Sequence, residues 1–558
     1  MKRILNHVCL AALAVAMIVA PAAGAFAQQR GGAAAQPVAV ISVASFDALK
    51  ADAGYLTRAA GVPSLGTFFE LSAAAYTTGL DTTKSSGVYV TMEGDQPRAV
   101  AFVAVKDLKA ALANLEEQIG KPVERDNGVL EIGLDRKAFV KEQEGWAFVS
   151  DRAENLTALP MDPSTLLAGL EGKYALAARV NMQNLPAEVR RMAIDELKKG
   201  FEQQLETARA NSDNPEAVDK LGRGTLDSLV RTIEESDQIT LGWAVDSAGR
   251  RTFLDISITA VPGTELARRM ALAKDSPTRF AGFRLPDAAV TVSSAAALPK
   301  ESVEQLVALI GVGRQQAMEG IDNDASLPDD AARDAVKGVV NRLMDLIQST
   351  IEEGQVDFGA SLVLEPGSFT FASGTTVADG AEASRLLARV VELAKNEPDF
   401  PDVKLNAARH GDVNLHTISI PVPEDDADAR RLLGERFEIV LGTAPKSFYV
   451  ALGKEPMVAL KGAIDKSAQA SDPLASPLRL EVALTPILKF AQSVQENPAL
   501  ELAVTAIERS GGKDRVAITS EAIENGVRTR IEVEDGILQL VGTVVRILQG
   551  PGLEGGNF

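Results

Sequence analysis

Few residues in this chain have the types and spacing that a metal or catalytic site requires. Beyond residue 27 the chain contains two histidines, His410 and His416, with Asp412 between them. Two imidazoles and a carboxylate could together ligate zinc. However, Gly411-Asp412 is typical of a turn between short strands, and no third strong ligand has suitable spacing. We therefore expect both histidines to lie on the surface, and we predict no metal site.

Carboxylates crowd the segment from Asp322 to Asp330 and could bind a hard cation such as Ca²⁺. The EF-hand pattern is absent, because the segment lacks both the glycine of the sharp turn and the closing glutamate. Acidic residues also stabilise the first turn of a helix, where backbone N–H groups are unpaired. We interpret this segment as a solvated loop that caps the next helix, and the acidic run after Pro423 as another helix start.

Two glycine-rich stretches resemble parts of nucleotide-binding motifs. Gly511-Gly512-Lys513 could belong to a phosphate loop, but Asp514 stands where that motif needs serine or threonine. Gly311-Val312-Gly313 follows an expected helix rather than a strand, so it does not indicate dinucleotide binding. No serine nucleophile stands in a convincing context. We predict no catalytic residues, no cofactor-binding residues and no cofactor.

Two tryptophans, Trp146 and Trp243, each follow a glycine in an expected strand. Either ring could stack on a sugar or a peptide. Large aromatic rings in strands also anchor hydrophobic cores. We interpret both tryptophans as buried core residues.

The elements that would position any site are hairpins followed by amphipathic helices. The clearest unit is Val356–Lys395, where apolar residues alternate with small or polar ones in two runs, which indicates two strands. Glu365–Ser368 separates the runs and has turn composition. After Asp379, leucines and valines at steps of three and four indicate a helix with one apolar face.

This unit occurs four times, beginning near Gly87, Ile239, Phe358 and Arg515. The first and third units, and the second and fourth, are offset by about 270 residues, which indicates an internal repeat. We therefore predict a tandem duplication with an α+β fold. Two similar tandem domains would each have an antiparallel β-sheet covered by amphipathic helices.

The first residues have the pattern of a secretory signal peptide. Lys2 and Arg3 are followed by an apolar stretch from Leu10 to Ala20 and by the small-residue cleavage site Ala25-Phe26-Ala27. An uncleaved anchor is the alternative, but the apolar stretch is short for a span. The predicted organisation is signal peptide 1–27, flexible leader 28–36, repeat domain A 37–283, repeat domain B 284–549 and flexible tail 550–558.

Composition limits the disulfides, the partners and the membrane segments that this chain can have. The only cysteine, Cys9, lies within the signal peptide, so we expect no disulfide. The formal net charge of −19 argues against binding to nucleic acid. No later apolar run approaches the ~20 residues that cross a bilayer, so we predict no transmembrane segment after signal cleavage. Aromatic residues make up 5% of the chain, so its cores must consist mainly of Ala, Val, Leu and Ile.

The signal peptide, the repeated α+β pattern and the stretch GWAFVSD at Gly145 to Asp151 resemble a loose group of uncharacterised exported bacterial proteins. The resemblance implies no activity and no site residues. We expect an exported envelope protein, periplasmic or extracellular, that acts by binding or scaffolding an unknown partner. Two alternatives stay open: a carrier of a lipid or other apolar ligand in a groove between sheet and helices, and a carboxylate-based hydrolase.

Overall fold

The computed structural model describes residues 36–549, except 75, 95, 134–136, 211–214, 325, 326, 328, 396–399, 472, 473 and 496. The expected signal peptide, the leader up to residue 35 and the tail lie outside the described residues. The chain divides into two compact units, and neither unit is one continuous stretch. Unit 1 comprises Met1–Leu197, Thr232–Pro262 and Arg530–Phe558, and unit 2 comprises Lys198–Arg231 and Gly263–Thr529.

The strands of unit 1 pair antiparallel in the order β4-β5-β6-β7-β3-β2-β1-β8-β9-β10. Their bounds are β1 (Ala39–Val43), β2 (Ser86–Glu93), β3 (Gln96–Ala104), β4 (Val123–Glu124), β5 (Val129–Ile132), β6 (Ala138–Gln143), β7 (Trp146–Ser150), β8 (Leu176–Asn181), β9 (Ser236–Asp246) and β10 (Arg251–Ala260). One face of these strands carries the main core, which includes Phe102, Phe148 and Leu170. The 3₁₀ helices η2 (Ala153–Leu156) and η3 (Pro163–Leu167) cover that core.

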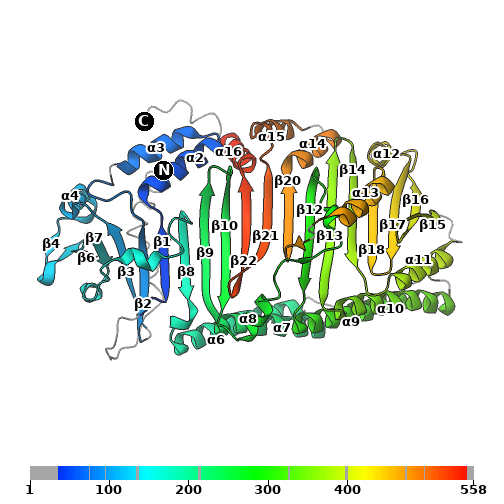
Figure 1. The fold of residues 1–558 in the computed structure, drawn as a ribbon, viewed down its shortest axis with the longest axis horizontal. Helices are drawn as coiled ribbons and strands as arrows, with labels where there is room; N and C mark the ends of the chain where they lie inside the picture. Colours follow the sequence, from blue (N-terminus) through cyan, green and yellow to red (C-terminus); the bar gives the residue numbers. More distant parts are fainter. Residues whose placement is uncertain are drawn as a thin grey trace. The chain divides into compact units, whose positions relative to one another are not determined.

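The long helices of unit 1 lie beyond the ends of its strands. Helix α2 (Phe46–Ala59) packs against α3 (Pro63–Ala74) and α16 (Asp535–Gln549), and Figure 1 shows all three near one end of β1, β8 and β9. Helix α6 (Ala187–Ala210) begins in unit 1. Two short helices, α4 (Leu108–Asn114) and α5 (Glu116–Ile119), contribute to a second core with β5, β6 and β7.

The strands of unit 2 pair antiparallel in the order β15-β16-β17-β18-β14-β13-β12-β20-β21. Their bounds are β12 (Ala288–Ala297), β13 (Gln355–Glu365), β14 (Ser368–Thr376), β15 (Asp402–His410), β16 (Val413–Pro421), β17 (Arg436–Ala444), β18 (Ser447–Gly453), β20 (Leu478–Ala483) and β21 (Arg515–Ile523). A separate two-stranded sheet joins β11 (Ser276–Pro277) to β19 (Leu474–Ala475).

Helices of unit 2 flank its strands at both ends. Figure 1 shows α12 (Ala427–Leu433) and α14 (Leu484–Val494) at one end and α9 (Lys300–Asp322), α10 (Asp330–Glu352) and α11 (Gly380–Ala394) at the other. Helix α13 (Pro456–Gln469) instead packs on one face of β14, β17 and β18, where it forms the core with Phe280 and Phe283. The remaining helices are α7 (Pro215–Glu235), which spans the boundary of the units, α8 (Glu265–Met270) and α15 (Pro498–Glu508).

The four predicted hairpins are confirmed as β2–β3, β9–β10, β13–β14 and β21–β22, the last strand being Gly526–Glu534. The local signals act as expected. Gly367 has a φ of 74° in the turn after β13, a conformation that costs glycine little. Asp379 caps α11, because its Oδ1 accepts hydrogen bonds from Ala381 N (2.8 Å) and Glu382 N (3.0 Å).

The prediction of two tandem similar domains, each with its own helix-covered sheet, is wrong. Strand pairing places 20 strands in one largely antiparallel sheet. The last hairpin does not complete a separate domain, because residues 526–529 of β22 cluster with unit 2 and residues 530–534 with unit 1. The edge of a hairpin carries unpaired N–H and C=O groups, and pairing them with neighbouring hairpins favours one continuous sheet.

The strand order itself repeats along the chain. Unit 1 contains the series β5-β6-β7-β3-β2-β1-β8-β9, and unit 2 contains the matching series β16-β17-β18-β14-β13-β12-β20-β21. The repeat in the sequence therefore corresponds to a repeated order of strands within one sheet.

Candidate functional site

The central strand of unit 2 buries its small and polar side and leaves its apolar side half-exposed. In β13, Asp357, Gly359 and Ser361 are buried, whereas Phe358 and Leu362 are not. The buried side is small because rings lie against it: a Cβ on Gly359 would approach the Cβ atoms of Phe280 and Phe283 to 3.1 Å. In an ordinary half-buried sheet the apolar side would be the covered one.

The half-exposed side chains of neighbouring strands form a continuous surface. Residues directly opposite one another in an antiparallel pair share a face, and the register places Leu362 opposite Phe371, Phe371 opposite Leu452 and Ile439 opposite Leu452. We call this surface the unit 2 apolar face. It comprises Val290, Val292, Phe358, Ala360, Leu362, Phe371, Ile439, Leu441, Val450, Leu452, Leu478, Leu480, Val482 and Ile518.

Helices lie at both ends of the strands that carry the unit 2 apolar face (Figure 1). Helix α14 contacts β12 and β13, and α11 contacts β17 and β18. Neither α9 nor α14 has a fully buried residue, although both carry apolar side chains on one side. Apolar faces of helices normally pack against a core, but those of α9 and α14 are only partly covered.

The strands of unit 1 also bury their small and polar side chains and leave their apolar side chains partly exposed. On β9 and β10, Gly242, Ala244 and Asp255 are buried, whereas Leu241 is 47% exposed and its partner Ile256 is 38% exposed. Leu176 of β8, which lies opposite Trp243, is 48% exposed. We call this surface the unit 1 apolar face, comprising Ile41, Leu176, Ala178, Val180, Ile239, Leu241, Trp243, Leu254, Ile256 and Ile258.

A polar cluster fixes the opposite, buried face of β10. Asp255 is fully buried, and its carboxylate accepts hydrogen bonds from Arg530 Nε (2.7 Å) and Nη2 (2.9 Å) and from the Tyr174 hydroxyl (3.0 Å). The Arg530 guanidinium also lies 3.8 Å from the centroid of the Phe253 ring. The Tyr174 ring lies on Gly242, where a Cβ would approach it to 2.6 Å. These contacts hold the polar side inward, so the apolar side must face outward.

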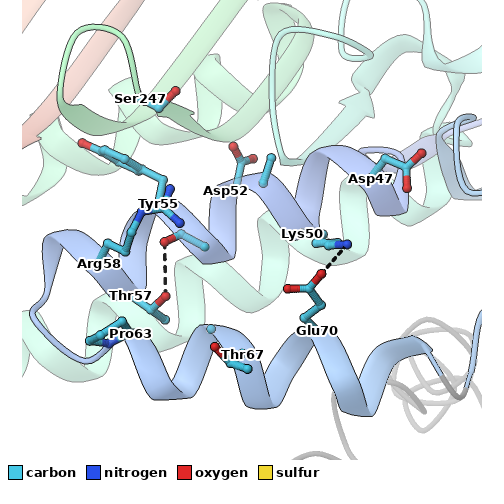
Figure 2. A pocket seen from close by; sticks show the side chains of 13 residues that line it. Asp47, Lys50, Asp52, Tyr55, Thr57, Arg58, Pro63, Thr67, Glu70 and Ser247 are labelled. Carbon is cyan, nitrogen blue, oxygen red and sulfur yellow. Dashed lines mark hydrogen bonds and ion pairs between the residues drawn. The ribbon is translucent and has the colours of Figure 1, made fainter.

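A polar cleft of about 680 Å³ lies in unit 1 between α2, α3 and the turn after β9 (Figure 2). Part of its wall is fixed by internal bonds. Lys50 Nζ lies 2.5 Å from Glu70 Oε1, and the Thr57 hydroxyl donates to the carbonyl oxygen of Ala53 (2.7 Å). Gly66 lets α3 approach α2 closely, because a Cβ there would overlap the Thr57 side chain.

Four polar side chains that line the cleft have no hydrogen bond or ion pair with the part of the chain that the structure describes. They are Asp52, Arg58, Thr67 and Ser247. Burial raises the pKa of Asp52 above its ordinary value. Figure 2 shows the Asp52 carboxylate directed toward the turn that carries Ser247, and Arg58 beside Tyr55. The cleft therefore presents the Asp52 carboxylate and the Arg58 guanidinium, which are not paired with each other, and also the Asp47 carboxylate, which accepts a hydrogen bond from Thr82 Oγ1 (3.3 Å).

The two histidines do not converge on a common site. His410 is partly exposed, and its Nε2 lies 2.7 Å from Asp465 Oδ1. The prediction that His416 lies on the surface is wrong, because its ring is 1% exposed. Its Nδ1 accepts a hydrogen bond from Asn406 N (3.1 Å) at an irregularity in β15, and its Nε2 lies 3.2 Å from Thr443 Oγ1. Burial lowers its pKa.

The two tryptophans have different environments. The prediction is confirmed for Trp146, which is 4% exposed and packs edge-on against Phe102 with centroids 5.7 Å apart. It is wrong for Trp243, which is only half-buried and belongs to the unit 1 apolar face. The Trp243 indole N–H donates to Thr252 Oγ1 (2.7 Å), so its ring has a fixed orientation on that face.

The acidic segments act as helix starts, as the sequence predicts. Asp329 caps α10 by accepting from Ala332 N (2.7 Å), and Asp426 caps α12 by accepting from Ala429 N (2.9 Å). Asp322 pairs with Lys337. Residues 325, 326 and 328 of the first segment lie outside the described residues. In the described part of the chain, no group of three or more His, Cys, Asp or Glu side chains is arranged to hold a metal ion.

Sequence reasoning missed both apolar faces and the polar cleft. A signal for the faces exists: in β13 the side chains between the large apolar ones include two glycine- or serine-sized residues and one carboxylate, which is unusual for a solvent-facing side. No comparable signal exists for the cleft, because its residues come from two helices and a distant turn. Among the described residues no helix is both long and apolar enough to span a bilayer.

Comparison with models of protein families gives no match. Comparisons with curated proteins and with solved structures give no significant match.

Proposed function

We propose that this protein is a non-enzymatic binding protein of the bacterial envelope that carries apolar, chain-like ligands on its two apolar faces. The observation that supports this most strongly is the inverted burial of the strands in both units. A stable soluble fold ordinarily gains free energy by covering residues such as Phe358, Leu241 and Ile256. Leaving them half-exposed while burying Asp255 and Asp357 is costly unless another molecule covers the apolar side.

The geometry favours a flexible chain over a flat protein surface. In unit 2, helices lie at both ends of the strands, and α10 and α11 pack against Phe448 on the same side of the sheet as the apolar face. These helices leave less room for a flat protein surface than for a flexible chain. Strands lie ~4.8 Å apart, so the four strands from β1 to β10 span about 14 Å. This matches the roughly 15 Å of hydrocarbon in one leaflet of a bilayer. An extended acyl chain therefore fits across the unit 1 apolar face.

Export is part of the proposal and depends on the sequence of residues 1–27. An envelope protein meets lipids and other amphiphiles that are poorly soluble in the aqueous space around it. A carrier with two apolar faces and a strongly acidic surface would stay soluble while binding such chains.

A displacement assay on the full chain tests the proposal. The fluorescent apolar probe N-phenylnaphthylamine is bound first, and lysolipids of increasing chain length then displace it below their micelle concentrations. Burying one methylene contributes ~0.8 kcal/mol, so affinity should rise by up to about fourfold per added methylene. Probe binding that is absent, or affinity that does not depend on chain length, would contradict the proposal.

Variants locate the binding surface. The substitution Leu241→Asp combined with Ile256→Lys places a pair of opposite charges on the unit 1 apolar face, at two directly opposite positions that are already partly exposed. The number of probe molecules bound per chain should fall, because only the unit 2 apolar face remains able to bind, while stability changes little. The matched control is Val458→Asp, because Val458 is 66% exposed on α13, which covers the opposite side of the sheet in unit 2. Equal effects of both changes would exclude the apolar face.

A further inference from the structure

An amphiphile whose acyl chain lies on the unit 1 apolar face also has a polar head group. The polar cleft of unit 1 is a candidate site for that head group. Helix α2 follows β1 almost directly, with Ser45 as its N-cap. Ser247 of the cleft follows β9 by one residue, and β9 carries Trp243 and Leu241 of the apolar face. The cleft therefore lies where the strands of that face end.

We propose that the cleft binds a zwitterionic phosphate–amine head group, with the phosphate at Arg58 and the amine at Asp52. This inference rests on the proposed function, because it assigns the head of the amphiphile whose chain lies on the unit 1 apolar face. The volume of about 680 Å³ is within the range of small-molecule sites.

The charges of the lining select this class of head group. Lys50 and Glu70 neutralise each other, whereas Asp52 and Arg58 have no ion-pair partner among the residues described. The Asp47 carboxylate, which accepts a hydrogen bond from Thr82 Oγ1, adds a second negative charge that favours the amine of the ligand. They are six residues apart on α2, which is about 9 Å along the helix axis at 1.5 Å per residue. A ligand with only a negative charge would leave the Asp52 carboxylate facing it, and a purely cationic ligand would leave the Arg58 guanidinium unpaired.

Hydroxyl groups and a fixed ring complete the site. Thr67 and Ser247 can donate hydrogen bonds to phosphate oxygens. The Tyr55 hydroxyl donates to Asp535, whose other oxygen accepts from Arg250 Nε (2.8 Å). These bonds tie the middle of α2 to the start of α16 and to the turn after β9. They hold Tyr55, and with it the cleft wall between Asp52 and Arg58, in one position.

The test compares lysolipids of identical chain length in the displacement assay on the full chain. We expect lysophosphatidylethanolamine to bind at least about tenfold more tightly than lysophosphatidylglycerol, which lacks the amine. Asp52→Asn should remove most of this preference, and Arg58→Gln should weaken both lysolipids about tenfold. The matched controls are Asp126→Asn and Arg191→Gln, which change exposed residues of unit 1 outside the cleft.

The outcomes separate the two proposals. Equal affinities for both lysolipids, unchanged by either cleft variant while the apolar probe still binds, would overturn the head-group site and leave the apolar faces intact. Loss of apolar probe binding in the parent protein would overturn the proposed function itself. Free phosphoethanolamine identifies the source of the group: much weaker competition than the lysolipid supports a lipid head group, and equal competition overturns it.

Discussion

At the scale of single residues, the buried side of unit 1 depends on Asp255. Its carboxylate has no exposed surface and is held by a bidentate contact with Arg530 and by Tyr174. Removing one partner of a buried ion pair leaves the other charge without compensation, which costs about 3–5 kcal/mol. A cluster of this kind on the covered face is one reason that the apolar side faces solvent.

We therefore predict that Asp255→Asn lowers the free energy of unfolding by about 3–5 kcal/mol. Urea unfolding followed by circular dichroism measures this change. Asp237→Asn serves as the control, because Asp237 is only half-buried at the start of β9 and should change stability by less than about 0.5 kcal/mol. A loss no larger than that of the control would show that the Arg530 contact does not hold the buried face.

His416 gives a prediction about pH. Because burial lowers its pKa in the folded protein, the unfolded chain, with an ordinary pKa near 6.5, binds a proton first as the solution becomes acidic. The contribution of His416 is therefore complete above about pH 6.5 and is lost as the pH falls below that value, by at most about 1.4 kcal/mol per pH unit.

Unfolding of the parent protein and of His416→Gln at pH 7.5 and pH 5.5 measures this contribution. The free energy of unfolding of the parent protein should fall more between pH 7.5 and pH 5.5 than that of the variant. A destabilisation of the variant that is equal at both pH values does not affect this comparison. An identical loss in the two proteins would mean that His416 has the same pKa in the folded and unfolded chains, so that burial does not lower it.

At the scale of elements, a close approach of α16 to α2 limits what side chain the helix can carry. Gly542 of α16 contacts the end of α2, and a Cβ there would overlap the carbonyl oxygen of Ala60. The backbone of Ala60 cannot rotate away as a flexible side chain would. The helix can lie against α2 only if the residue at this position is glycine.

We predict that Gly542→Ala destabilises the packing of α16 by about 1–3 kcal/mol, because overpacking forces the two helices apart. Hydrogen exchange of the α16 amides would report this locally. Gly338→Ala is the control: Gly338 lies in α10 with open space around it, so alanine there should stabilise the helix by about 0.5–1 kcal/mol. If both variants gain stability, the α2–α16 contact is not tight.

Most of the hairpins could be predicted from the sequence because their signals are local. The alternation in β13 and β14, the turn at Gly367 and the cap at Asp379 all act within one stretch of chain. Helices α14 and α15 were not anticipated, because their apolar residues are too frequent to show a clear period and each contains an early proline. The burial of His416 and the exposure of Trp243 depend on neighbours far away in the sequence.

At the scale of the whole molecule, local patterns show which residues alternate but not which side is covered. The large apolar residues of β13 look like a core in the sequence, yet the covered side is the one with Asp357 and Ser361. That choice is made by Phe280 and Phe283, nearly eighty residues away in the chain, and by α13. For the same reason, the sequence could not show that the repeated hairpins pair into one sheet.

The unit 1 apolar face and the core of the same unit each contain one tryptophan, so a single experiment can compare them directly. Single-tryptophan variants, Trp146→Phe and Trp243→Phe, are titrated with a lysolipid whose acyl chain carries bromine, a short-range quencher of indole fluorescence. We predict saturable quenching of Trp243 and none of Trp146. Quenching of neither residue, or equal quenching of both, would contradict the claim that the exposed side of this sheet binds an acyl chain.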